Sequence, residues 1–200
     1  MDEAFQRKYG RVLEALPDVA ECAGKNLILV GGTALALFHL EHRISVDLDF
    51  VPLEGKDTQM KESLKGCLTK KGYRTQRAAY ANQFVIQFED TAIKVEVFES
   101  AHAIKNVKEF EIGNSRILVA SAEDILQMKL QSYADRREAR DLFDIVFILK
   151  EAGKGVGIVS GLIRSHGKPK NMDEIEGMVA RKTDYGFFRK VVDDASKTGD

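Results

Sequence analysis

Hydrophobic and polar positions along the chain predict a mixed α/β half followed by a helical half. Apolar residues recur at helical spacing over residues 3–16, where Pro17 is expected to end the helix, and a second helix is expected over 57–71. The runs QFVIQFED and AIKVEVFE indicate an antiparallel hairpin, and FEIGNSRILVA indicates another pair of strands around Gly113 and Asn114.

From Ser121 onward the pattern becomes helical. A capping box (SAED) precedes ILQMKLQSYA, REARDLFDIVFILKEAG forms the next helix, and two more are expected around 172–181 and 184–196. The predicted fold class is therefore α/β (α+β), with a small mixed β-sheet flanked by helices. Residues 1–120 would form this core, and residues 121–200 a helical region packed against it.

Residues 27–50, LILVGGTALALFHLEHRISVDLDF, carry the most informative pattern. NLILV is typical of a buried strand, and Thr33 is placed to cap the apolar helix ALALFHLE. SVDLDFV alternates with period two, which puts Asp47 and Asp49 on the side of a strand opposite its apolar residues. The β-carbons of these two aspartates would lie roughly 6–7 Å apart.

Composition and charge narrow the function classes. With 44% apolar and 30% charged residues the chain is typical of a globular protein, and its net charge of −1 excludes a globally basic nucleic-acid-binding protein but not a local basic groove. Cys22 and Cys67 lack metal-type spacing, so neither a disulfide framework nor a zinc site is expected. No membrane-spanning run or secretory signal is present, so we expect a cytoplasmic, reduced, soluble protein.

Two carboxylates on one side of a strand repel each other. At ~4 Å and an effective dielectric constant of ~20, the repulsion is about 4 kcal/mol. A divalent cation such as Mg²⁺ or Mn²⁺ offsets this cost, since these ions take oxygen ligands. The structural alternative is that one aspartate caps a backbone turn while the other pairs with Arg43.

The Gly31-Gly32-Thr33 turn favours the metal interpretation. Between a strand and a helix, glycines let phosphate oxygens approach backbone N–H groups, and Thr33 adds a hydroxyl donor. Such a turn alone often serves only as a tight connector. Followed by Asp47 after thirteen intervening residues, it describes a triphosphate cradle beside a metal site.

The segment VGGTALALFHLEHRISVDLDF resembles the signature of the DNA-polymerase-β-like nucleotidyltransferase superfamily. Within it, GGTALAL and HRISVDLDF are similar to the AbiEii/AbiGii-type toxins of type IV toxin–antitoxin and abortive-infection systems. The resemblance implies transfer of a nucleoside monophosphate from an NTP to an acceptor hydroxyl. It also implies two metal ions held by three carboxylates, two of which would be Asp47 and Asp49.

The implied third carboxylate lies on a neighbouring strand. Glu96 is the only acid centred in the apolar strand AIKVEVF, so it is the candidate metal ligand and base, although the superfamily usually has an aspartate there. Lys94 shares its face. The structural alternative is a solvent-facing Lys-x-Glu pair.

EDILQMKLQSYADRREARDLFD resembles two later motifs of the family. The D-x4-K motif matches Asp124 and Lys129, and the R-x-x-[KR]-D-x-x-D motif matches Arg137, Arg140, Asp141 and Asp144. By spacing alone, the arginines and aspartates of the second motif form two i,i+4 pairs, each worth ~0.2–0.5 kcal/mol on a solvated helix face. The apolar residues between them indicate a buried helix instead.

The resemblance assigns roles to most of these residues. Arg43 would hold a phosphate or orient Asp49. The implied nucleotide-binding residues are Gly31, Gly32, Thr33, Arg43, Ser45 and Lys129. The implied acceptor-side residues are Lys94, Arg140, Asp141 and Asp144.

A basic stretch also follows the predicted strand of the aspartates. It consists of Lys61, Lys65, Lys70, Lys71, Arg74 and Arg77. A solvated helix face explains such a stretch, and contact with an acceptor RNA is the functional alternative.

The leading function is thus an NTP-dependent nucleotidyltransferase toxin with RNA, tRNA by family, as acceptor and a cognate antitoxin as partner. The same chemistry on a small-molecule or protein acceptor is the first alternative. A non-catalytic nucleotide-binding module is the second, and the complete set of three acids argues against it.

Overall fold

A computed structural model describes residues 3–155 and 157–197. Its centre is a mixed seven-stranded sheet in the order β3-β4-β5-β2-β1-β7-β6. The strands are β1 (Leu27–Val30), β2 (Leu48–Pro52), β3 (Arg74–Arg77), β4 (Gln83–Gln87), β5 (Ala92–Val97), β6 (Val107–Ile112) and β7 (Ser115–Ala120). The predicted fold class is confirmed.

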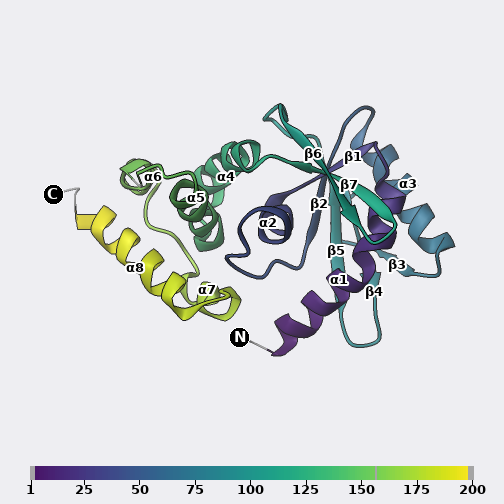
Figure 1. Ribbon diagram of the computed structural model, residues 1–200, viewed down its shortest axis with the longest axis horizontal. Helices are drawn as coiled ribbons and strands as arrows, with labels where there is room; N and C mark the ends of the chain where they lie inside the picture. The colour runs from purple at the N-terminus through teal and green to yellow at the C-terminus, as the bar shows by residue number, and fades with distance from the viewer. Residues whose placement is uncertain (1–2, 156, 198–200) are drawn as a thin grey trace.

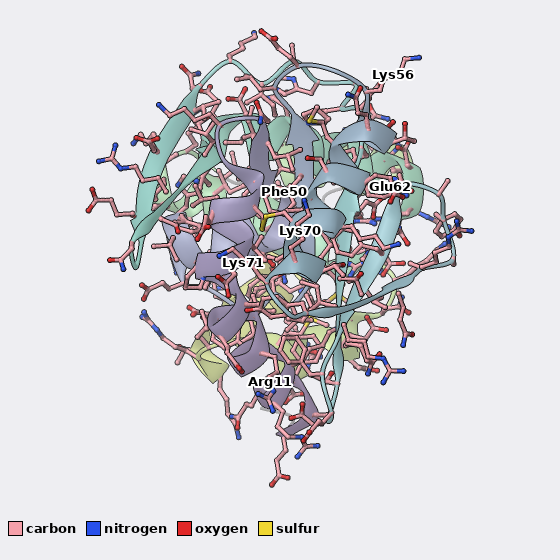
Figure 2. All side chains as sticks on the ribbon, turned by 90° about the vertical axis from the view of Figure 1, so that its right-hand side faces the viewer. Arg11, Phe50, Lys56, Glu62, Lys70 and Lys71 are labelled. Atoms are coloured by element: carbon pink, nitrogen blue, oxygen red, sulfur yellow. A yellow bond between two sulfur atoms is a disulfide. The ribbon has the colours of Figure 1, made fainter. Side chains whose placement is uncertain are left out.

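Helices lie on both sides of the sheet. They are α1 (Glu3–Ala23), α2 (Gly31–Leu35), the π-helical turn η1 (Ala36–Leu40), α3 (Asp57–Lys70), α4 (Ala122–Arg136), α5 (Ala139–Glu151), α6 (Gly157–His166), α7 (Met172–Met178) and α8 (Lys182–Lys197). Figure 1 shows α1 and α3 on one side of the sheet and α2, α4 and α5 on the other, with α6 to α8 farther out. Figure 2 looks onto the side of α1 and α3.

The strand predictions are largely confirmed. Both hairpins form, β4 with β5 and β6 with β7, and each pair is antiparallel. Strand β3 was not predicted, because its sequence RTQR has no apolar residue. It is an edge strand that pairs only with β4.

Helix α1 corrects the prediction that Pro17 ends the first helix. The helix continues through Pro17 to Ala23. A proline inside a helix removes one backbone hydrogen bond. Burial of Val19, Ala20 and Ala23 against the rest of the protein favours the continued helix over a break.

Thr33 does not cap a helix, contrary to the sequence prediction. Helix α2 begins at Gly31, and its N-cap residue Val30 makes no side-chain cap bond. Thr33 is fully buried, and its hydroxyl donates a hydrogen bond to the backbone carbonyl of Asp47. It therefore ties the helix to the segment that carries the aspartates.

The helical half agrees with the sequence at its start and in α7 and α8, which match the helices expected around 172–181 and 184–196, and it differs between them. Ser121 caps α4 as predicted, accepting a hydrogen bond from the Asp124 N–H at 3.1 Å. Helix α6 was not predicted, because glycines at 155, 157, 161 and 167 interrupt the sequence in and around it. Within the described residues, no helix is both long and apolar enough to cross a membrane.

Cys22 and Cys67 form a disulfide, which corrects the expectation from their spacing. The bond joins the end of α1 to α3, two helices that pack together on one side of the sheet. Sequence spacing could not reveal this pairing, because it depends on how the helices meet in space.

We expect reduction of this disulfide to lower the free energy of unfolding by about 2–4 kcal/mol, because a cross-link restricts the unfolded chain. The measurement is urea unfolding with and without dithiothreitol, with the Cys22→Ser/Cys67→Ser double variant as control for the reductant. Two thiols titrating in the native, oxidised protein would contradict the expectation.

Candidate functional site

One cavity of about 380 Å³ gathers most of the residues that the sequence singled out. Its walls come from α1, the Gly31-Gly32 turn, β2, β5 and α4, so both halves of the chain contribute. The predicted residues that line it are Gly31, Gly32, Arg43, Ser45, Asp47, Asp49, Lys94, Glu96, Lys129 and Arg140. Thr33, Asp141 and Asp144 are not in its lining.

The three predicted acids lie together on the sheet side of the cavity. Strands β2 and β5 are parallel neighbours, and their register places Asp49 directly beside Glu96. Asp47 lies two residues before Asp49, on the same side. The choice of Glu96 as the third acid therefore agrees with its position in the structure.

Two lysines partly neutralise these acids. The Lys94 ammonium lies 3.5 Å from an Asp47 oxygen and 3.7 Å from a Glu96 oxygen. Lys8 reaches across from α1 to within 3.6 Å of the other Asp47 oxygen. Lys8 was missed, because nothing in the sequence indicates that the first helix returns to the site.

Asp49 has a perturbed pKa. Burial raises its pKa to about 6, and the nearby Asp47 and Glu96 charges act in the same direction. The Lys94 charge opposes that shift. The carboxylate thus lies where an added cation would be favoured.

The glycine turn leaves space for side chains of the site. Gly31 has a φ of +73°, and a β-carbon there would lie 2.5 Å from Asp49 Oδ2. At Gly32 a β-carbon would lie 2.8 Å from Ser45 Oγ and would also clash with Arg43. Both positions therefore exclude a larger residue even without a bound phosphate.

Two amide side chains hold Glu96. Asn82 Nδ2 donates to Oε1 and Gln83 Nε2 donates to Oε2, each at 2.9 Å. Gln83 lies directly opposite Glu96 in the β4–β5 ladder. Neither amide was predicted from the sequence, although the hairpin register places Gln83 opposite Glu96.

Asp144 anchors the opposite wall. It is fully buried on α5 and accepts two hydrogen bonds from Arg43, at 2.6 and 2.7 Å. Lys129 from α4 lies 2.7 Å away and His42 Nε2 2.8 Å away. Although burial opposes ionisation, the Arg43 and Lys129 charges hold the Asp144 pKa well below its usual range.

This pairing corrects two predictions. The Arg43 guanidinium forms its side-chain ion pair with Asp144, so it does not orient Asp49. Asp144 has Arg43, and not Arg140, as its arginine partner. It stands behind the cavity wall, so it does not face an acceptor.

Asp141, like Asp144, is a buried carboxylate paired with cations. It is fully buried, with Lys129 at 2.8 Å and Arg136 at 2.6 Å. The predicted pair with Arg137 fails because Arg137 adopts a left-handed conformation (φ 57°) that ends α4 before α5 begins.

Arg140, which the family resemblance places on the acceptor side, lines the cavity. Its Nε is buried and has no hydrogen-bond partner within residues 3–155 and 157–197. A buried donor left unpaired is costly, so this nitrogen is available to an anionic ligand.

Asp124, the first residue of the D-x4-K motif, is structural. It accepts hydrogen bonds from Ser121 Oγ and from the backbone N–H of Asn106, and His102 Nε2 lies 2.9 Å away. These contacts tie the loop after β5 to the start of α4. The motif's Lys129, in contrast, reaches the cavity.

As the side chains stand, no group of three or more His, Cys, Asp or Glu residues in the described ranges is arranged to hold a metal ion. The Lys94 ammonium lies within 4 Å of both Asp47 and Glu96. The three acids themselves supply only oxygen donors, which is the set that Mg²⁺ and Mn²⁺ prefer.

A known protein family matches most of the chain. Residues 11–194 match the family described as nucleotidyl transferase AbiEii toxin, type IV toxin–antitoxin system. Among curated proteins, none matches the chain.

Solved structures show the same fold at low sequence identity. JHP933 from Helicobacter pylori is 18% identical, with a TM-score of 0.55 over 99% of this chain and 96% of that one. A candidate nucleotidyltransferase from H. pylori is 17% identical, with a TM-score of 0.57 over all of both chains. The antibiotic-resistance factor ANT(2'')-Ia is 12% identical, with a TM-score of 0.51 over 76% of this chain and 89% of that one.

The buried Asp144 and the partly exposed Asp47 are expected to contribute differently to the free energy of unfolding. In Asp144→Ala, Arg43 and Lys129 stay buried without the carboxylate that neutralises them. The substitution should therefore cost about 3–5 kcal/mol of unfolding free energy. Asp47→Ala removes only partly exposed contacts and should cost about 1 kcal/mol or less. Urea unfolding of the two variants measures the difference, and equal losses would refute the anchoring role of Asp144.

Proposed function

Because the chain belongs to the AbiEii nucleotidyl transferase toxin family, we propose that its cavity transfers a nucleoside monophosphate from an NTP to an acceptor hydroxyl. The observation that carries the proposal is the division of charge within one cavity. Asp47, Asp49 and Glu96 line the sheet side, whereas the helical wall presents cations, among them Lys129 and Arg140.

The cationic wall fits a triphosphate. Lys129 and Arg140 come from α4 and α5, and both line the cavity opposite the acids. Lys129 is fixed by two buried aspartates, and Arg140 retains a buried donor without a partner. Prepositioned cations of this kind stabilise the charge that develops as pyrophosphate leaves.

The donor set on the sheet side fits Mg²⁺ or Mn²⁺, with Asp47, Asp49 and Glu96 as ligands. Such ions supply Lewis-acid activation of the acceptor hydroxyl and of the phosphate. The Lys94 ammonium now lies where a cation is electrostatically favoured, which supports the assignment. Lys94 would have to move aside for metal binding.

In the proposed reaction, the acceptor oxygen forms a bond to the α-phosphorus while the bond to the pyrophosphate oxygen breaks. Glu96 takes the proton of the acceptor hydroxyl. Asn82 and Gln83 fix both of its oxygens, which limits the freedom that its extra methylene adds relative to an aspartate.

For the acceptor we favour RNA, with tRNA first, in a toxin that a cognate antitoxin controls in the cytoplasm. The family description, which names a type IV toxin–antitoxin system, supports the partner. A small molecule or a protein hydroxyl remains the alternative acceptor. A non-catalytic nucleotide-binding module is disfavoured by the three acids lying side by side.

The test incubates the protein with Mg²⁺, total RNA and each of the four α-labelled NTPs. Label in a tRNA-sized band identifies the acceptor class and the base together. Label on protein would replace RNA with a protein acceptor, and NTP binding without any transfer to RNA or protein would leave a small-molecule acceptor or a binding module.

Asp49→Asn should keep the fold and reduce transfer by more than about 100-fold, since changes to residues that only support metal ligands already cost about 10–100-fold. Asp194→Asn, an exposed aspartate of α8, is the matched control and should retain activity. Full turnover by folded Asp49→Asn protein would remove Asp49 from the metal site.

Asn82→Ala should weaken Mn²⁺ binding by about tenfold, because Glu96 loses one of its two amide donors. Electron paramagnetic resonance of free Mn²⁺ measures this without any reaction, and the exposed Asn114→Ala in the β6–β7 turn is the control. Unchanged Mn²⁺ affinity would mean that Asn82 does not position a ligand.

A further inference from the structure

Strands β3, β4 and β5 have one covered face and one open face. Helix α3 packs against β3 and β5, and α1 also packs against β5, all on one side. On the other side α2 packs against β1 and β2, at the middle of the sheet. The side chains of the other face, from Gln76, Val85 and Lys94 among others, are half-buried or exposed.

The register shows that this face begins at the acids. Residues directly opposite each other in a sheet share a face. One row therefore runs from Asp49 through Glu96 to Gln83. The next row consists of Lys94, Val85 and Gln76, and the last of Ala92, Gln87 and Arg74.

We call this surface the open sheet face, defined by Arg74, Gln76, Gln83, Val85, Gln87 and Lys94. Two strand spacings separate β5 from β3, so the face extends about 10 Å outward from Glu96. It is continuous with the cavity, because Lys94 and Glu96 line both.

The chemistry of the face differs from that of the whole chain. The protein has a net charge of −1, but Glu96 is the only acidic residue in the three strands. Arg74 and Lys94 add positive charge, and three glutamines carry amide groups that donate and accept hydrogen bonds. A polar, cationic sheet surface is suited to phosphates and base edges.

We infer that the open sheet face binds the terminal nucleotides of a single-stranded acceptor RNA and leads their hydroxyl to Glu96. This inference rests on the proposed transferase function and assigns the acceptor a path. RNA fits better than a peptide, since its backbone is anionic throughout and the face offers Arg74 and Lys94, with carboxylates only at the proposed metal site where the face begins. The NTP occupies the cavity on the other side of the acids, where Lys129 and Arg140 lie.

The test uses two charge changes on the open sheet face and two matched changes on the opposite side of the sheet. Arg74→Glu and Gln76→Glu add negative charge to the RNA path. Lys56→Glu, at the exposed N-cap of α3, and Gln59→Glu, at an exposed position within it, make the same changes on the side that Figure 2 shows.

We expect Arg74→Glu to raise the KM for RNA about tenfold or more, and Gln76→Glu to raise it in the same direction. The KM for NTP should stay unchanged. For Arg74→Glu, the slope of log K for RNA binding against log salt should also fall by about one, because a phosphate contact is lost. Both α3 variants should behave as the unaltered protein.

The outcomes separate this inference from the proposed function. If the unaltered protein labels RNA but Arg74→Glu and Gln76→Glu match the α3 controls, the open sheet face is not the RNA path and the transferase function stands. If label reaches a protein or small molecule and never RNA, both the RNA acceptor and this inference are wrong, while the transfer chemistry remains. If no label is transferred at all, the proposed function itself fails.

Discussion

The buried charge of Asp144 is the interaction on which the site depends. A carboxylate removed from water is costly unless cations and hydrogen bonds compensate, and Arg43 and Lys129 both do so here. Arg43 belongs to the segment between the glycine turn and β2, and Lys129 to α4. One side chain on α5 thereby holds α4 and the segment before β2 together and supports the wall of the cavity from behind.

On the sheet side of the cavity, charges of the same sign lie together instead of being fully paired. There three acids lie close together, and their mutual repulsion is reduced by Lys8 and Lys94. Because the acids repel one another, binding of an added cation beside them is favoured. The fixed cations of the helical wall favour binding of a phosphate. This separation of acids and cations would give the cavity its affinity for a metal-bound triphosphate. The separation is already present in the folded protein before a ligand binds.

Much of this arrangement could be predicted from sequence, because it is local. Period-two alternation located Asp47 and Asp49. The family resemblance implied a third acid, and Glu96 was the only acid centred in the second strand of the predicted hairpin. Contacts between distant elements could not be predicted. Arg43 and Asp144 lie 101 residues apart, and their pairing depends on how α5 packs.

The remaining wrong predictions have the same cause, because they too concern contacts between elements that are separated along the chain. The Arg137–Asp141 pair assumed that Arg137 belongs to the helix of Asp141, but the left-handed Arg137 ends α4 and α5 begins at Ala139. The Arg140–Asp144 pair is replaced by the contact of Asp144 with Arg43. The disulfide was missed because the first helix continues past Pro17 and packs beside α3. Lys8 was missed because the sequence does not show that this helix lies beside the aspartates. Spacing along a chain indicates which residues share an element, and packing alone decides which elements share a site.

The most direct test of the account is a crystal of the protein soaked in Mn²⁺, with anomalous scattering recorded at the manganese edge. The account predicts a peak bounded by Asp47, Asp49 and Glu96, with the Lys94 ammonium moved away from Asp47. Saturating Mn²⁺ without a peak there, with Lys94 still between Asp47 and Glu96, would contradict it.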